Sequence, residues 1–92
     1  MATVAINKAL PIEDNLRELV TGQGTDDRFA HCATELAQAY GAQMGVIGMG
    51  ELKPDLADVW HAWFQYSGLR TEGYGYSARK ALEMAIWHWI TC

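Results

Sequence analysis

The sequence predicts an α+β fold that is mainly helical, with about four amphipathic helices and a small two- or three-stranded sheet. Four segments repeat apolar residues at the three- and four-residue spacing of a helix that is buried on one side. Glycines and prolines separate these segments, and two shorter runs of β-branched or aromatic residues lie between them. At 92 residues, the chain has room for one hydrophobic core, so we expect a single compact domain over residues 1–92.

The N-terminal half is expected to contain two helices and a strand. Residues 2–7 are partly β-branched and favour an edge strand or an extended arm. A proline at the first helical position and glycines at the end bound a helix over residues 11–20. A threonine N-cap and a following glycine bound a second helix over residues 25–40. The apolar, glycine-rich run 44–49 is too short for a helix and indicates a buried strand.

The C-terminal half is expected to contain two further helices. Residues 54–67 begin with a proline and precede a glycine, and their apolar stripe predicts a third helix whose aromatic residues lie in the core. That stripe comprises Leu56, Val59, Trp60, Trp63 and Phe64. Tyrosines alternate with glycines over residues 69–76, which suits a strand or an extended turn. Ser77 caps the last helix, whose alanine stripe allows a neighbouring element to approach closely. The predicted order is therefore β-α-α-β-α-β-α.

Charge and cysteine content restrict the classes of partner and location. The net charge of −4 disfavours a general nucleic-acid binder and allows a partner with a basic surface. The two cysteines, Cys32 and Cys92, do not form the pattern of a secreted disulfide framework. The N-terminus lacks the pattern of a signal peptide, and no apolar run approaches the ~20 residues that span a bilayer. We therefore expect a cytoplasmic protein.

No catalytic or metal motif stands out, so we predict a non-enzymatic protein that needs neither cofactor nor metal. Cys32 lies on an apolar stripe, where a thiol behaves as a small hydrophobe, and Ser77 is explained as a cap. Asp58 and His61 are three residues apart and would share one face of the predicted third helix. With His88 they leave open the alternative of a small metal-binding enzyme, although a full site needs further ligands.

Six residues are the candidates for partner binding. Trp87 lies in the polar face of the last helix, where an indole indicates an interface unless the helix is covered on both sides. Arg79 and Lys80 occupy the first turn of that helix, where the dipole disfavours cations, and Arg70 lies just before it. Contacts to phosphates or to a partner's carboxylates would explain these cations, and a solvated surface is the alternative. The acidic pair Asp26 and Asp27 completes the set, as part of an acidic side that suits basic grooves.

Two segments resemble the helices of small phage-encoded α+β proteins. Residues 54–64 place Pro54 and Leu56 before Trp60, and residues 76–89 read Tyr-Ser-Ala-x-x-Ala-Leu-x-x-Ala from Tyr76 to Ala85. Phage sandwich domains show similar helices, and some anti-CRISPR proteins are short acidic chains that end in an alanine-rich helix near a tryptophan. The resemblance implies a viral or mobile-element origin and assigns no functional residues.

These observations lead to one main hypothesis and two alternatives. The main hypothesis is a non-enzymatic inhibitor of a bacterial defence complex, of the anti-CRISPR kind, that blocks a surface needed by nucleic acid or by a protein subunit. Its partner would be a host protein or ribonucleoprotein, met in the bacterial cytoplasm, with direct nucleic-acid contact a minor component. The first alternative is a homo-oligomeric structural protein with Trp87 buried against a second copy. The second is the metal-binding enzyme considered above.

Overall fold

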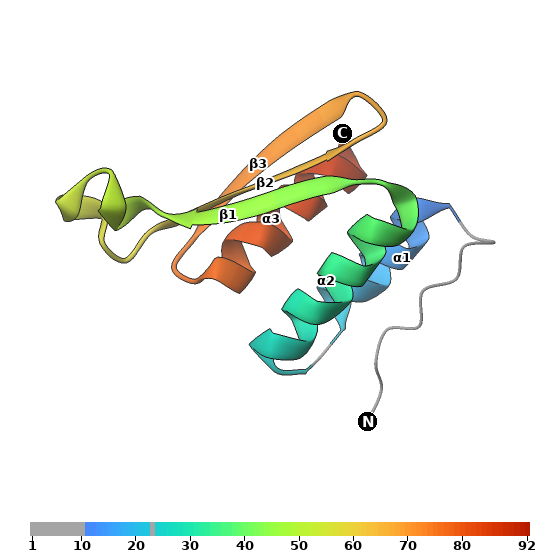
Figure 1. The fold of residues 1–92 in the computed structure, drawn as a ribbon, viewed down its shortest axis with the longest axis horizontal. Helices are drawn as coiled ribbons and strands as arrows, with labels where there is room; N and C mark the ends of the chain where they lie inside the picture. Colours follow the sequence, from blue (N-terminus) through green and yellow to red (C-terminus); the bar gives the residue numbers. More distant parts are fainter. Residues whose placement is uncertain (1–10, 23) are drawn as a thin grey trace.

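The computed structural model describes residues 11–22 and 24–92, and over these residues the fold is α+β. Two helices, three strands and a last helix follow one another (Figure 1). Their bounds are α1 Ile12–Thr21, α2 Asp26–Tyr40, β1 Gln43–Gly48, β2 Trp60–Tyr66, β3 Leu69–Gly75 and α3 Ala78–Thr91, with short 3-10 turns η1 Met49–Glu51 and η2 Pro54–Leu56 between β1 and β2. The arm or strand predicted over residues 2–7 lies outside the described residues.

The three strands form an antiparallel sheet in the order β1-β2-β3, with β2 at its centre. Gln43 pairs with Gln65 at one end of the β1–β2 ladder and Gly48 pairs with Trp60 at the other. A two-residue turn joins β2 to β3. Its residues Ser67 and Gly68 have φ values of 56° and 81°, and positive φ at both positions matches the right-handed twist of the flanking strands.

All three helices pack into one core on the same face of the sheet, and α3 makes the closest contact, against β3 and β2 (Figure 1). Gly73 of β3 makes this approach possible, because a Cβ atom there would lie 2.3 Å from the Ala85 nitrogen of α3. The Thr71 hydroxyl donates a 2.6 Å hydrogen bond to the Ala85 carbonyl and joins the same two elements. The largest fully buried apolar side chains are Leu16, Leu36, Phe64 and Ile86. Each contributes roughly 1.5–3 kcal/mol through burial.

The predicted helix boundaries in α2 and α3 are confirmed. The Thr25 side chain accepts a hydrogen bond from the Arg28 amide, and Gly41 ends α2 in the left-handed conformation with φ of 73°. The Ser77 hydroxyl accepts from the Lys80 amide at 3.1 Å. Pro11 is the N-cap of α1, one position earlier than predicted, because the first helical residue is Ile12.

The predicted third helix is wrong, and the described residues contain three helices instead of four. Residues 60–66 form the central strand, and only Pro54–Leu56 make a short 3-10 turn. Trp60 and Phe64 are four residues apart, a spacing that places them on one face in both a helix and a strand. Trp63 also fits a helical stripe, but in the strand it points to the face opposite Phe64, so its prediction as a core residue is wrong.

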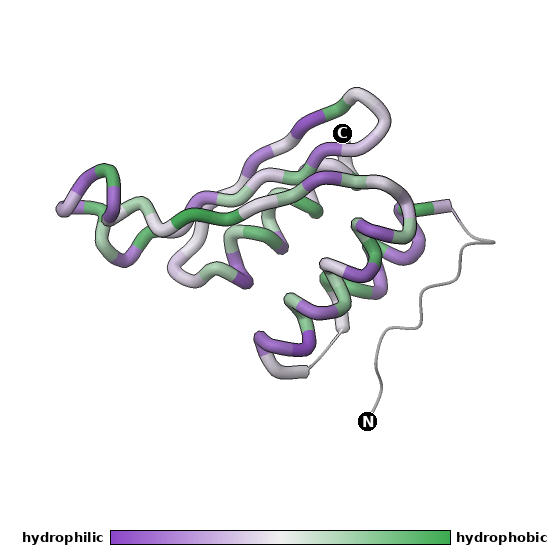
Figure 2. Tube along the Cα trace, in the orientation of Figure 1, coloured by the Kyte–Doolittle hydropathy of each residue, from purple (hydrophilic) through white to green (hydrophobic). Residues whose placement is uncertain are grey.

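Beyond the sheet, η1 and η2 extend the molecule past the end of β1 and β2. Figure 2 shows that this extension mixes apolar and polar residues, and Leu52 within it is 66% exposed. Across the described ranges, no helix has the length and hydropathy required to cross a membrane.

The close approach of α3 to β3 predicts that Gly73→Ala destabilises the protein strongly. The added Cβ would meet backbone atoms of α3, and such overpacking costs about 1–3 kcal/mol in the free energy of unfolding. Urea unfolding, followed by circular dichroism, measures this loss. Gly48→Ala is the matched control, because its Cβ would lie at an ordinary 3.5 Å from the Trp60 ring. Equal urea midpoints for the two variants would contradict the role assigned to Gly73.

Candidate functional site

The sheet has an open face, on the side away from the three described helices. Ala62 and Phe64 of β2 are buried against the helices, so the intervening residues point to the other side. Directly paired residues of an antiparallel ladder share a face, and the β2–β3 register therefore extends this surface across both strands. The resulting set, called here the open face, comprises His61, Trp63, Gln65, Arg70, Glu72 and Tyr74, next to Gln43, Gly45 and Ile47 of β1.

Side-chain contacts hold the open face in a defined arrangement. The ring of His61 stacks on Tyr74, with centroids 4.6 Å apart and planes 21° apart. Its Nε2 atom lies 2.6 Å from the Glu72 carboxylate. The Arg70 guanidinium lies over the Trp63 ring, 5.3 Å from its centroid. The Trp63 indole in turn covers Gly45, where a Cβ would come within 2.1 Å of the ring. The result is a flat, largely aromatic surface with few free side-chain rotations.

The open face presents one titratable pair beside its aromatic rings and arginine. His61 and Glu72 form a histidine–carboxylate pair, which could orient a general base, but acyl or group transfer also needs a nucleophile. The two cysteines lie elsewhere, Cys32 half-buried in α2 and Cys92 at the chain's end. The described residues contain no group of three or more His, Cys, Asp or Glu side chains arranged to hold a metal ion. Asp58 and His61 do not share a helix face, because His61 belongs to β2 and pairs with Glu72.

Two of the residues predicted for partner binding, Arg79 and Asp26, meet at the junction of α2 and α3. Arg79 donates to the Gly24 carbonyl at 2.7 Å, to Asp26 at 3.3 Å and to Glu83 at 3.1 Å. Its guanidinium also lies 5.0 Å from the centre of the Phe29 ring. The hydrogen bond to Glu83 is the main reason that the pKa of Arg79 is raised above its usual value, and Asp26 adds to this effect. These contacts explain a cation at a helix N-terminus by packing within the fold.

The other four predicted residues are dispersed. Lys80 is exposed on the first turn of α3, 4.0 Å from Glu83, and Asp27 is exposed beside Asp26. Trp87 is 37% exposed and has Arg17 of α1 over its ring, so the indole covers the contact between α1 and α3. Arg70 is the only one of the six that lies on the open face.

Sequence reasoning missed most of the open face. His61 and Trp63 were assigned to a helix, and Glu72 and Tyr74 were not proposed as binding residues. The signal that was present is the period of two over residues 60–66, where Trp60, Ala62, Phe64 and Tyr66 alternate with His61, Trp63 and Gln65. Interpreted as a strand, that pattern places a tryptophan and a histidine together on the face opposite the buried Ala62 and Phe64.

Comparisons with known proteins found no match for this chain among protein-family models, among curated proteins or among solved structures. The assignment of a site therefore depends on the chain's own geometry. By that criterion, the open face is the strongest candidate, because three aromatic rings, an arginine and a carboxylate converge on it.

The hydrogen bonds of Arg79 predict that Arg79→Ala lowers stability whereas Lys80→Ala does not. Arg79 is 19% exposed at its side chain and loses three partners, which corresponds to about 1–2 kcal/mol of unfolding free energy. Lys80 is 63% exposed and loses one distant ion pair, which contributes close to nothing. Chemical denaturation of both variants tests the difference, and equal stabilities would show that Arg79 has no structural role.

Proposed function

We propose that this chain is a non-enzymatic binding protein that attaches to a partner protein through the open face of its sheet. The observation that supports the proposal is the aromatic cluster on the open face, where Tyr74 is exposed, Trp63 and His61 are half-buried, and Arg70 lies over the tryptophan ring. Tryptophan, tyrosine and arginine are the residues most enriched at the energetic centres of protein interfaces. Because their positions are already fixed by the sheet and by mutual contacts, little conformational entropy is lost on binding.

The distribution of charge favours a protein over a nucleic acid as the partner. The open face carries one arginine, one glutamate and one histidine, whereas single strands bind to aromatic platforms inside strongly basic grooves. The helical layer is acidic. Its α1 and α2 helices hold six carboxylates and two arginines, which equals the net charge of −4 of the whole chain. Nucleic acid would be repelled by that layer.

The specific role that we propose is inhibition of a bacterial defence complex. The resemblance of residues 76–89 to small phage proteins supports a viral origin, whereas residues 54–64, the other part of that resemblance, do not form an α-helix. The open face would occupy a protein surface of the complex that a subunit or a nucleic acid needs. The acidic α1 and α2 helices, on the other side of the sheet, would favour approach to a basic machine in the bacterial cytoplasm. The small size of the chain supports a role that depends on binding alone.

The proposal predicts that Trp63→Ala weakens partner capture by about thirtyfold or more, the effect expected of a central interface residue. The experiment is a tagged pull-down from a bacterial lysate that contains a CRISPR effector complex, with recovered proteins identified by mass spectrometry. Tyr74→Ala, at a residue that is 57% exposed, is a second open-face variant with little risk to folding.

Trp87→Ala is the matched control, because it removes a tryptophan that packs against α1 and lies off the open face. Capture that survives Trp63→Ala and Tyr74→Ala but fails with Trp87→Ala, at unchanged circular dichroism, would move the site to α3. Recovery of the tagged chain alone would contradict the proposed inhibition of a bacterial defence complex.

A further inference from the structure

The two edges of the sheet differ in how their backbone groups are satisfied. At the β3 edge, the Glu72 carbonyl points away from β2 and accepts a 2.7 Å hydrogen bond from Nδ1 of His88 in α3. The side chains of Arg70 and Glu72 add charge to that edge. Bound backbone groups and charged residues are the usual means by which proteins prevent an edge from pairing with another strand.

The β1 edge has neither form of protection among the described residues. The Met49 amide donates to the Val59 carbonyl at 2.8 Å, and hydrogen-bonded pairs alternate along an antiparallel ladder. The backbone groups of Met44, Val46 and Gly48 therefore point outward. The six residues of β1 contain no charged side chain and no proline, and their pairing with β2 runs without a bulge. Such an edge is competent to accept a further strand.

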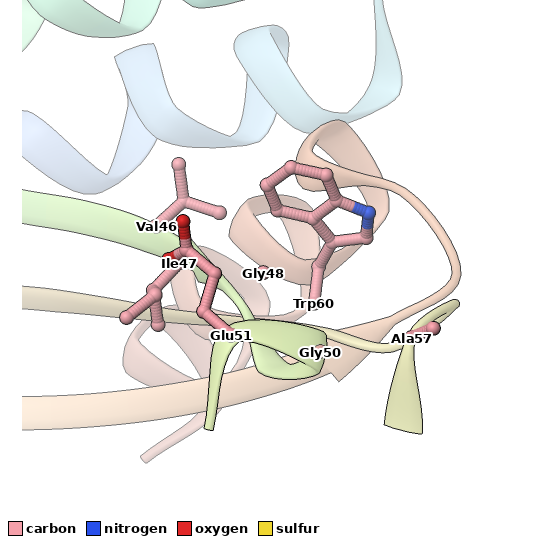
Figure 3. A pocket seen from close by; sticks show the side chains of 7 residues that line it. All are labelled: Val46, Ile47, Gly48, Gly50, Glu51, Ala57 and Trp60. Carbon is pink, nitrogen blue, oxygen red and sulfur yellow. The ribbon is translucent and has the colours of Figure 1, made fainter. Parts of the chain in front are cut away.

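A hollow of about 540 Å³ lies at the end of this edge, lined by residues of β1, η1 and β2 and by Ala57, which follows η2. Figure 3 shows Val46 and the indole of Trp60 on the same side of the sheet, with the Glu51 carboxylate extending toward Val46. Gly48 lies across from Trp60 in the register and has no side chain, so the indole is reachable from the edge. A side chain opposite Gly48 on an added strand would enter this hollow.

The charges around the hollow select the kind of side chain that fits. Glu51 is the only charged residue that lines it, and no ion pair within the described part of the chain neutralises Glu51. On the other side of Val46, a second hollow of about 240 Å³ is lined by Asp26, Asp27 and Arg79, and Arg79 pairs with Asp26. The first hollow therefore combines the Trp60 ring with the Glu51 carboxylate. This combination suits a lysine or arginine side chain, whose aliphatic part can contact the ring while its charged group lies near the carboxylate.

We propose that the β1 edge binds an extended segment of a partner protein as a fourth strand, and that a lysine or arginine of that segment enters the hollow beside Trp60. Main-chain hydrogen bonds to Met44, Val46 and Gly48 would provide affinity, and the hollow would provide specificity, as in other cases of strand addition. This site adjoins the open face at Ile47, which lines the hollow, and it does not use the aromatic side chains of that face.

The test uses two fluorescein-labelled nine-residue peptides of alternating threonine and valine, one with lysine and one with glutamate at the centre. Fluorescence anisotropy with the full chain should show binding of the lysine peptide, and at least about tenfold weaker binding of the glutamate peptide. Hydrogen exchange measured by NMR should slow at the amides of Met44, Val46 and Gly48 when the lysine peptide is present. Glu51→Lys should reverse the preference between the two peptides.

Val46→Pro is the decisive variant, because it removes an outward-pointing donor and leaves the hydrogen bonds between β1 and β2 in place. It should weaken binding of the lysine peptide at least about tenfold, whereas Tyr74→Ala on β3, away from the β1 edge, should leave it unchanged. Wild-type affinity in Val46→Pro, or equal affinity for the two peptides, would overturn the proposal. Sedimentation of the free chain could also overturn the proposal. If the chain forms a dimer and Val46→Pro dissociates it, then a second copy of the chain, and not a partner segment, pairs with the β1 edge.

Discussion

The contact between α3 and β3 at Gly73 determines which face of the sheet is buried. A glycine at this position lets the backbone of the helix approach the backbone of the strand, with Ala81 and Ala85 completely buried beside it. The Thr71 hydroxyl bonds to the Ala85 carbonyl and holds the helix at that distance. With this face closed by α3, strand alternation leaves every second residue of β2 and β3 on the other side.

The open face follows from that alternation, and its contents are unusual for a solvent-facing sheet. The solvated face of an antiparallel sheet usually carries polar side chains. Here the rings of Trp63 and His61 on β2 lie next to the ring of Tyr74 on β3. The Trp63 ring needs Gly45 beneath it, so the glycine of β1 and the tryptophan of β2 together form one flat element. Partly exposed aromatic side chains that are held in place by mutual contacts are typical of an interface.

The local signals in the sequence predicted both α2 and α3, because Thr25, Gly41 and Ser77 act through neighbouring backbone groups alone. Strands β1 and β3 were also indicated by their composition, but β1 is an edge strand with no buried residue and not the buried strand that was predicted. The central strand was missed, since Trp60 and Phe64 fit two periods and only the pairing partners of β2 decide between them. That error also hid the site: His61 meets Glu72 and Tyr74 through strand pairing over a long sequence distance, which spacing along one segment cannot reveal.

The open face and the β1 edge adjoin at Ile47, and one feature of the charge distribution also connects them. The net charge of the chain resides on α1 and α2, and the sheet with α3 and its connections is close to neutral. An acidic layer beside a neutral sheet attracts a basic partner over distance, while the short-range contacts are made by rings and backbone groups that salt screens little. Raising the ionic strength should therefore slow association with a basic partner more than it speeds dissociation. A partner held mainly by ion pairs with α1 and α2 would instead be lost through faster dissociation.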